Sequence, residues 1–419
     1  MKEIPSYKFK FSLGCGFLFA ITLLPCIAIA QSSTEAAQVS TADKVKNHDS
    51  IPQQEDIVDF FIRLTKINIK HKEDSEAVRP GKILPAVFPA IGYTQINGIV
   101  GVVAANLSFY TGDIHLNNLS TVTASPTYSQ HKQIIIPINS TIWFDKNKFD
   151  LLGDYRFYKY PSFTYGLGGL SSIDNQDRID YSFAKISQEI LMRLAKDLYG
   201  GVGYALDYHF NIEDLGSLTD FQLYNNYATT TTSSGLTVHL KYDSRKNINN
   251  PKNEFFASVI FRDNYTWLGS DQNWQSLQFE FRKYIKLSPN KNRVLAFWSW
   301  DNFTFGKAPY LDLPSTGWDT YSNTGRGYIQ GRYRGTDLLY LESEYRFDIT
   351  RNGLLGGVLF VNAQSVPEWP SGQFKSVNPA EGFGLRLKLN RYSDTNLCVD
   401  YAFGTEGAQG IYFNLGEVF

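Results

Sequence analysis

Apolar and polar residues alternate one by one along many short segments of this chain. In 234–244, apolar residues fall on the even positions from Leu236 to Tyr242, and polar residues fall on the odd positions from Thr237 to Asp243. Successive side chains of a β-strand point to opposite faces, so each such segment predicts a strand with one apolar and one polar face. Clusters of Asn, Pro, Gly and Ser separate the segments, as expected of turns. The predicted strands are 96–110, 118–129, 131–145, 147–159, 181–195, 199–211, 215–228, 234–244, 253–266, 272–286, 293–306, 338–350, 353–366, 381–390, 395–404 and 410–419.

The polar faces of several predicted strands carry charge. In 339–349, Glu342, Glu344, Arg346 and Asp348 lie on one face, opposite apolar residues. A charged side chain at mid-depth in lipid costs about 2–4 kcal/mol, so this face must line a wet lumen, where the charges need partners. The pattern predicts an all-β fold, a transmembrane antiparallel β-barrel of about sixteen strands. A soluble secreted β-sandwich also alternates in this way and is the competing interpretation.

The first thirty residues, 1–30, have the features of a cleaved signal peptide. Three lysines precede an apolar run over 11–30, which closes with the A-x-A pattern Ala28-Ile29-Ala30. An uncleaved membrane anchor is the alternative, although the run is short for a helix that must span about 20 residues. No later segment has about 18 consecutive apolar residues, so a membrane location requires a closed barrel. We therefore expect export to the outer membrane of a Gram-negative-type envelope.

The mature chain divides into an N-terminal segment, which we call the lead, and a barrel. Residues 31–80 begin with a stretch rich in Ser, Thr, Ala, Gln and Asp, a composition typical of disorder. Within this lead, 55–69 has apolar residues near one helical face, which predicts a short amphipathic helix. The helix either packs under the barrel or plugs it. Residues 81–419 form the predicted transmembrane barrel.

Composition argues against several functional classes. The net charge of -1 leaves no basic field for nucleic acid. Cys15 and Cys26 leave with the signal peptide, so Cys398 is alone and no internal disulfide is expected. None of the six histidines lies in a nucleophile-elbow setting, and the polarity of the lumen explains His239. No metal-ligand spacing or phosphate-binding loop occurs, so we expect no metal, no cofactor and no enzyme activity.

The final segment suits the closing edge of a barrel. Apolar residues fall at Ile411, Phe413, Leu415 and Phe419, with Glu417 interrupting the series. A strand with one apolar and one polar face fits a wall between lipid and a wet lumen. We expect this segment to be the last strand, with Phe413, Leu415 and Phe419 as its apolar signal.

A long loop, 307–337, separates two predicted strands and contains Arg326-Gly327-Tyr328. This tripeptide resembles the RGF/RGY loop tip of the bacterial surface antigen superfamily, which includes the BamA-type assembly factors, TamA and the two-partner-secretion transporters. One such motif is weak, whereas five in order over about 82–419 make a specific signal. The other four resemblances are Tyr165-Gly166-Leu167-Gly168, Tyr242-Asp243-Ser244-Arg245 with Pro251, Gly382-Phe383-Gly384-Leu385-Arg386 and Gly416-Glu417-Val418-Phe419.

The resemblance implies a barrel of about sixteen strands whose long sixth extracellular loop folds back into the lumen. The loop arginine, here Arg326, would then meet an acidic residue on the inner wall. Asn362 replaces the aspartate of the superfamily; it can accept a hydrogen bond from Arg326 but gives no ion pair. We therefore expect Glu342 and Glu344 to balance the charge, with Asp400 as a third candidate.

The resemblance also implies a function. A weak seam between the first strand, 96–110, and the last strand, 410–419, would let the wall open sideways and assist the insertion or translocation of an exported protein or a lipid. The superfamily's periplasmic polypeptide-transport domains have no counterpart here, and a separate periplasmic partner is one candidate to supply them. A passive or structural channel without client handling is the alternative. We expect a monomeric barrel in contact with outer-membrane lipids.

Overall fold

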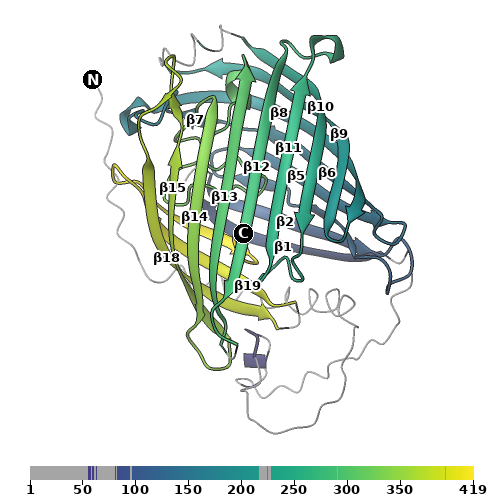
Figure 1. Cartoon of the computed structure of the whole chain (residues 1–419). Helices are drawn as coiled ribbons and strands as arrows, with labels where there is room; N and C mark the ends of the chain where they lie inside the picture. The colour runs from purple at the N-terminus through teal and green to yellow at the C-terminus, as the bar shows by residue number, and fades with distance from the viewer. Residues whose placement is uncertain are drawn as a thin grey trace.

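The computed structural model describes residues 55–57, 59–60, 63, 81, 83–94, 97–216, 224, 228–289, 291–391 and 393–419. Most of these residues belong to one sheet of 18 antiparallel strands, which curves into a barrel of strongly tilted strands (Figure 1). A two-stranded ribbon, β16 (Pro367–Glu368) and β17 (Gln373–Phe374), lies outside this sheet. No helix in the described part of the chain is long and apolar enough to cross a membrane.

The strands of the wall follow one another in chain order. Neighbours along the chain pair antiparallel, from β1 with β2 to β19 with β20. Their bounds are β1 Leu84–Thr94, β2 Gly98–Phe109, β3 Ser120–Ala124, β4 Thr127–Ser129, β5 Ile134–Phe144, β6 Phe149–Lys159, β7 Ser162–Thr164, β8 Asp177–Ala195, β9 Leu198–Asp214, β10 Thr230–Asp243, β11 Phe255–Asn264, β12 Trp274–Lys286, β13 Arg293–Gly306, β14 Asp337–Asp348, β15 Leu355–Ser365, β18 Asn378–Asn390, β19 Thr395–Phe403 and β20 Gln409–Leu415.

These 18 strands occupy sixteen strand positions around the wall, because two positions are each shared by two strands. β3 and β4 both pair with β2 and β5, so they are the two halves of one interrupted strand. β6 and β7 both pair with β8, so β7 continues β6. The interruption lies opposite Pro137 on β5, whose carbonyl accepts the N–H of Ser125 at 3.3 Å but which has no N–H to return. The predicted all-β barrel of about sixteen strands is confirmed.

The outer wall of the barrel is apolar. Along β10, Leu236, Val238 and Leu240 are exposed, whereas Thr237 and His239 between them are buried on the lumen side. An apolar surface of this extent on a polar-lined barrel is what contact with lipid requires. Exposed apolar residues recur at every second position on other strands, for example Ile99 and Val103, Leu339 and Leu341, Leu359 and Val361, and Phe383 and Leu385.

The first strand differs from the sequence prediction, which began the barrel at 96–110. The barrel begins one strand earlier, at β1. This strand was not predicted because Pro85 and Pro89 interrupt its alternating pattern. Proline is tolerated on edge strands, where one side needs no N–H. Most of the candidate strand 215–228 lies outside the described residues, and residues 215, 216, 224 and 228, which are described, are not in a strand. The signal peptide and most of the lead at 31–80 lie outside the described residues.

One end of the barrel, which we call the turn end, carries short turns and the described part of the N-terminal segment. Glu55 donates its backbone N–H to the carbonyl of Asn352 at 3.0 Å, in the turn between β14 and β15. Arg391, in the turn between β18 and β19, donates to the carboxylate of Asp59 at 2.7 Å. The opposite end, where the longest loop leaves the wall, is the loop end. The helix predicted over 55–69 falls mostly outside the described residues, so its packing stays a prediction.

Val238→Arg tests the lipid-facing wall. Val238 is 57% exposed and lies between Val202 and Phe261 of the neighbouring strands. An arginine at mid-depth should lower the free energy of unfolding by about 2–4 kcal/mol, measured by urea titration of the barrel in lipid vesicles. Ile248→Arg, in the turn after β10, is the control and should change it by less than about 0.5 kcal/mol. Equal effects of the two variants would contradict a lipid-facing Val238.

Candidate functional site

The loop between β13 and β14, residues 307–336, folds into the barrel. A β-bridge between Ser315 and Arg334 joins its two arms. Asp319 shapes the tip, because its Oδ1 accepts the backbone N–H of Asn323 at 2.8 Å. A carboxylate that accepts backbone N–H groups fixes a turn that no strand pairing supports. The loop therefore enters the lumen as an ordered hairpin.

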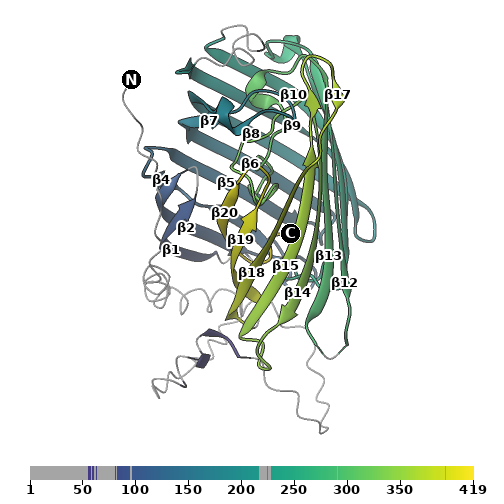
Figure 2. The same cartoon turned by 90° about the vertical axis from the view of Figure 1, so that its left-hand side faces the viewer.

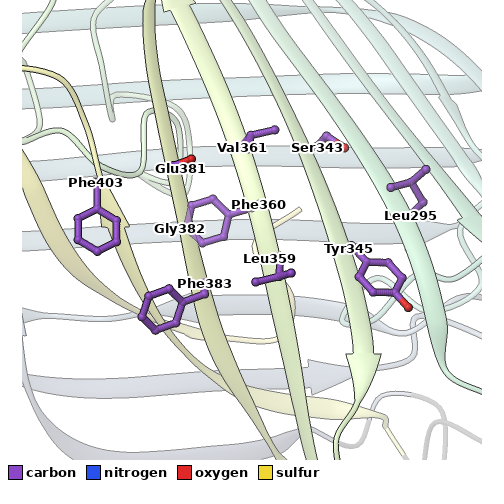
Figure 3. Close-up of a pocket in the computed structure, with 10 residues that line it drawn as sticks. All are labelled: Leu295, Ser343, Tyr345, Leu359, Phe360, Val361, Glu381, Gly382, Phe383 and Phe403. Atoms are coloured by element: carbon purple, nitrogen blue, oxygen red, sulfur yellow. The ribbon is translucent and has the colours of Figure 1, made fainter.

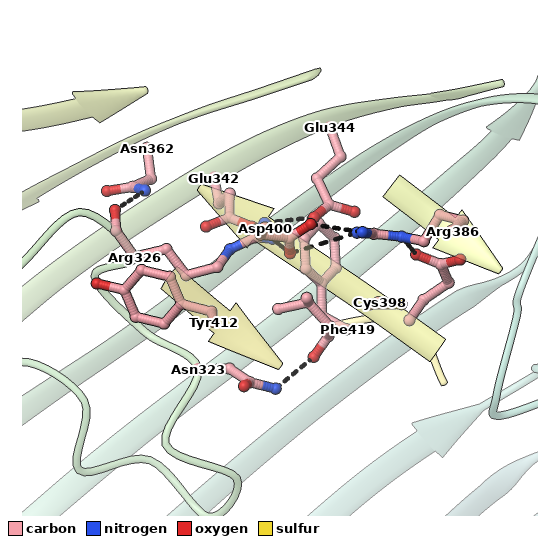
Figure 4. A network of polar contacts seen from close by, with 12 residues as sticks. Asn323, Arg326, Glu342, Glu344, Asn362, Arg386, Cys398, Asp400, Tyr412 and Phe419 are labelled. Atoms are coloured by element: carbon pink, nitrogen blue, oxygen red, sulfur yellow. Dashed lines mark hydrogen bonds and ion pairs between the residues drawn. The ribbon is translucent and has the colours of Figure 1, made fainter. Parts of the chain in front are cut away.

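The side chain of Arg326, at the loop tip, lies at the centre of a buried charge network (Figure 4). Its Nη2 donates to Glu342 and Glu344 on β14, and its Nη1 donates to Asp400 on β19 at 2.5 Å. Its guanidinium carbon also lies 3.7 Å from the ring centroid of Phe360 on β15. Only 1% of this arginine is exposed. One loop residue thus ties three wall strands together.

Asn362 contacts the loop in a different way from the sequence prediction. Its Nδ2 donates to the backbone carbonyl of Arg326 at 2.8 Å, instead of accepting a hydrogen bond from the guanidinium. Asp400, expected only as a third candidate, contacts the guanidinium alongside the two glutamates. An uncharged amide suits position 362, since a fourth carboxylate would add repulsion to a site that already holds three.

Two further arginines extend the network. Arg346 on β14 contacts Glu344 at 2.6 Å, and Arg386 on β18 contacts Asp400 at 2.5 Å. Glu417, near the end of the chain, accepts from Nε of Arg386 at 2.8 Å. The whole network comprises the guanidinium groups of Arg326, Arg346 and Arg386 and the carboxylates of Glu342, Glu344, Asp400 and Glu417.

Burial of so many charges has a high desolvation cost, which mutual attraction offsets only when every partner is in place. Loss of one partner leaves an uncompensated buried charge, at a cost of about 3–5 kcal/mol. A misplaced loop tip would have the same effect on three carboxylates at once. We therefore interpret the network as the device that specifies one position of the loop.

Gly327 lies where the loop touches the inner wall. Its φ is +111°, and a Cβ there would lie 2.6 Å from Cβ of Ala380 and 3.0 Å from the carbonyl oxygen of Phe403. Both the backbone conformation and the space therefore require glycine. The next residue, Tyr328, donates its hydroxyl to the carbonyl of Pro379 at 2.6 Å. The predicted tripeptide motif thus docks as a unit against β18 and β19.

Tyr412 on β20 links the loop tip to the last strand. Its hydroxyl accepts the N–H of Gly327 at 2.8 Å and donates to the carbonyl of Tyr328 at 3.0 Å. Gly410, two residues earlier, makes room for the ring, since a Cβ there would lie 2.9 Å from Cε2 of the tyrosine. Tyr412 is not among the site residues predicted from the sequence, although the alternation along β20 places it on the lumen face.

β20 ends at Leu415, and the residues after it turn into the lumen, where Figure 1 marks the end of the chain. Gly416 allows this turn with a φ of +83°, and its N–H donates to the carbonyl of Asn396 at 2.8 Å. The sequence prediction ran the strand on to Phe419. Phe413 and Leu415 do lie on the outer face, at 41% and 58% exposure, but Phe419 does not.

Phe419 occupies a socket on the inner wall. Its ring stacks on Trp298 of β13 with centroids 5.2 Å apart, and Arg346 donates to its carbonyl oxygen at 3.0 Å. Asn323, at the loop tip, donates to the carbonyl of Val418 at 2.8 Å. The end of the chain is therefore held by β13, β14 and the loop.

The first arm of the loop reaches the opposite side of the barrel. Asp312 accepts a hydrogen bond from the hydroxyl of Ser233 on β10 at 2.6 Å and lies 3.5 Å from Nδ1 of His209 on β9. Burial, reinforced by the charge of Asp207, raises the pKa of Asp312 to about 7, so this carboxyl group titrates near neutral pH. The loop thus crosses the lumen from β9 and β10 to β19 and β20.

A second buried cluster joins three strands of the wall. Nε2 of His239 on β10 lies 2.9 Å from the hydroxyl of Ser258 on β11, and its Nδ1 lies 2.6 Å from the carboxylate of Glu189 on β8. Gly203 on β9 lets the glutamate cross, since a Cβ there would lie 2.6 Å from its Cγ. The order resembles a nucleophile triad. The backbone of Ser258 lies inside a continuous ladder with both neighbours, so it offers no oxyanion hole. We interpret the cluster as mutual satisfaction of buried polar groups.

A hollow of about 420 Å³ lies on the outer face of β13 to β19 (Figure 3). Leu359, Val361, Phe383 and Phe403 line it, with Glu381 beside them. Pockets for specific ligands combine an apolar lining with several convergent polar groups. Since apolar side chains dominate here on a lipid-facing surface, we interpret the hollow as part of the lipid contact.

Solved structures with a similar fold are BamA and CdiB barrels. BamA from Haemophilus ducreyi lacking POTRA domains 1-3 has a TM-score of 0.54 and 15% identity, covering 80% of this chain and 70% of that chain. CdiB from Acinetobacter baumannii has a TM-score of 0.53 and 11% identity, and the match covers 80% of this chain and 59% of that chain. CdiB from Escherichia coli has a TM-score of 0.52 and 10% identity, and the match covers 79% of this chain and 67% of that chain. No protein-family model and no curated protein matches the sequence. The chain has the barrel fold of BamA and CdiB, as the motifs predicted.

Arg326→Lys tests whether the network depends on a planar guanidinium. An ammonium group cannot bridge Glu342, Glu344 and Asp400 at once, so a buried carboxylate loses its partner. We expect the free energy of unfolding to fall by about 3–5 kcal/mol in a urea titration. Arg178→Lys, at an exposed ion pair, is the matched control and should cost about 0–1 kcal/mol. A loss at Arg326 no greater than in this control would contradict the central role of the network.

Proposed function

We propose that this chain is a non-enzymatic barrel of the outer membrane that assists the insertion or translocation of proteins, or lipids, through a lateral seam between β1 and β20. The observation that carries the proposal is the state of the last strand. β20 pairs with β19, but among the described residues no strand pairing joins it to β1. Figure 2 views the barrel from the side on which these strands lie. An unpaired edge within a wall is a place where the strand of another chain can add.

Besides its ladder with β19, β20 and the residues after it are held by contacts inside the barrel. Tyr412 binds the loop tip, Glu417 binds Arg386, and Phe419 fills its socket. Opening of the seam would therefore not have to break a backbone ladder between the first and last strands. It would have to loosen side-chain contacts, which are worth about 1 kcal/mol each when neutral and more for the buried charged pair of Glu417 and Arg386.

The occupied lumen favours the seam over a passive channel. The loop crosses the lumen from Asp312, beside β10, to Gly327, beside β20. Conduction through a barrel depends on a free path lined by groups that bind weakly. A buried charge network fixes the loop across that path, so a route through the wall suits the structure better than a route along the lumen.

The same structure suggests the surroundings of the barrel. The apolar outer face suits outer-membrane lipids, and the fold shared with BamA and CdiB supports an exported protein as the client. A separate periplasmic partner would dock at the turn end, where Glu55 and Asp59 already contact the wall turns.

We infer a monomeric barrel, because the sheet curls on itself. We also infer no enzyme activity, since the Ser258 cluster lacks an oxyanion hole.

Photo-crosslinking in living cells tests the seam. A photoreactive amino acid replaces Phe413, on the outer face of β20, or Leu341, which is 63% exposed on β14 far from the seam. We expect covalent adducts with an exported protein from position 413 and none from position 341, since only the former lies on a strand that borders the proposed seam. The adducts are identified by mass spectrometry. Adducts from position 413 with β1 of the same chain alone would contradict the proposal and favour a structural barrel.

A further inference from the structure

The hollow on the outer face of β13 to β19 has a polar side and an apolar side (Figure 3). Ser343 of β14, Val361 of β15 and Glu381 of β18 lie in one row, because each is the cross-strand partner of the next. The lining residues of the next row toward the turn end are apolar or aromatic, namely Leu295, Tyr345, Leu359 and Phe383. The hollow therefore offers a carboxylate and a hydroxyl on its loop-end side and an apolar surface on its turn-end side.

Glu381 is an ionisable residue on the lipid-facing side of the wall. Its side chain is exposed, and among the residues that the structure describes its carboxylate has no hydrogen-bond or ion-pair partner. Its cross-strand neighbours, Val361 and Phe403, are exposed apolar residues, as is Phe383 two positions along the strand. A charge on a lipid-facing surface is costly unless it is paired, and such residues commonly mark functional sites. The wall leaves this carboxylate to be paired from the membrane.

The hollow is large enough to hold part of one small molecule. Its floor includes Gly382 and the ring of Phe360, and a Cβ on this glycine would lie 2.4 Å from Cζ of the ring. Its volume of about 420 Å³ lies within the range of roughly 300–1,000 Å³ that is typical of pockets for small ligands. An apolar hollow that opens to lipid suits an acyl chain, because the chain brings no polar group that would need a partner there.

We propose that the hollow binds one membrane lipid with a primary ammonium headgroup, which pairs with Glu381 while an acyl chain lies against Leu359 and Phe383. An ammonium group has three N–H donors, so it satisfies a carboxylate that the wall leaves unpaired. A headgroup whose only charge is a phosphate would instead place two negative charges side by side. The lining residues include none from β1 or β20, so the inference goes beyond the proposed function and does not depend on the seam.

Photoactivatable lipids test this site. The full barrel is placed in phosphatidylcholine nanodiscs that contain a trace of a probe lipid with a diazirine in its acyl chain. The probe has either a phosphatidylethanolamine or a phosphatidylglycerol headgroup, and labelled residues are mapped by mass spectrometry. We expect the ethanolamine probe to label Leu359 and Phe383 about fivefold more than the glycerol probe does. The two probes should label Leu236 and Leu240, on the outer face of β10, equally.

Two variants separate the headgroup contact from the acyl-chain contact. Glu381→Gln keeps the size of the side chain but removes its charge, so it should abolish the difference between the two probes at the hollow. Val361→Phe fills the hollow and should lower labelling there by both probes. Val238→Phe, at an equally exposed valine on β10, is its matched control and should leave labelling of the hollow unchanged.

Equal labelling of the hollow by the two probes in the wild-type barrel would overturn the proposal, and this comparison needs no variant. An ethanolamine preference that persists in Glu381→Gln would overturn the pairing with this carboxylate. Equal effects of Val361→Phe and Val238→Phe on labelling of the hollow would overturn the hollow as the place of the acyl chain. Heat-modifiable mobility in gel electrophoresis checks that each variant is folded.

Discussion

The contact of Arg326 with three buried carboxylates is the interaction on which the other lumen contacts depend. It fixes the loop tip against β14 and β19, and it brings Gly327 close enough to the wall that only glycine fits. The guanidinium and its partners are costly to bury singly and tolerable only together. The loop therefore has one well-defined position. The parts of the barrel that contact the loop tip are fixed in position by it.

The last strand is one of those parts. β20 has a backbone ladder on one side, and its lumen face is held by Tyr412 through the loop tip. The residues after Leu415 are held by the outer members of the same network, through Glu417 and Arg346. β20 thus has a backbone ladder on one side and a lumen face that is positioned from inside the barrel.

Much of this structure was predictable from the pattern of the sequence, and the failures have physical causes. Alternation identified the lumen faces that carry Glu342 and Glu344, and the tripeptide at Arg326 identified the loop that meets them. Alternation cannot reveal a strand such as β1, whose prolines are tolerated only because it is an edge. It also continued the last strand to Phe419, since the turn at Gly416 depends on tertiary contacts with the wall. Tyr412 lay on the expected face, but its partner could be found only once the loop had a position in space.

The measurement that tests the account most directly is the protection of β20 against hydrogen exchange when its link to the loop is cut. Tyr412→Phe removes both hydrogen bonds to the loop tip, whereas Tyr401→Phe removes a hydroxyl that binds Gln409 at 2.6 Å on the outer side of the same two strands. The account predicts that the amides of 409–415 exchange about 5–30-fold faster in Tyr412→Phe than in Tyr401→Phe. Equal exchange rates in the two variants would show that the last strand does not depend on the loop, and would contradict the account.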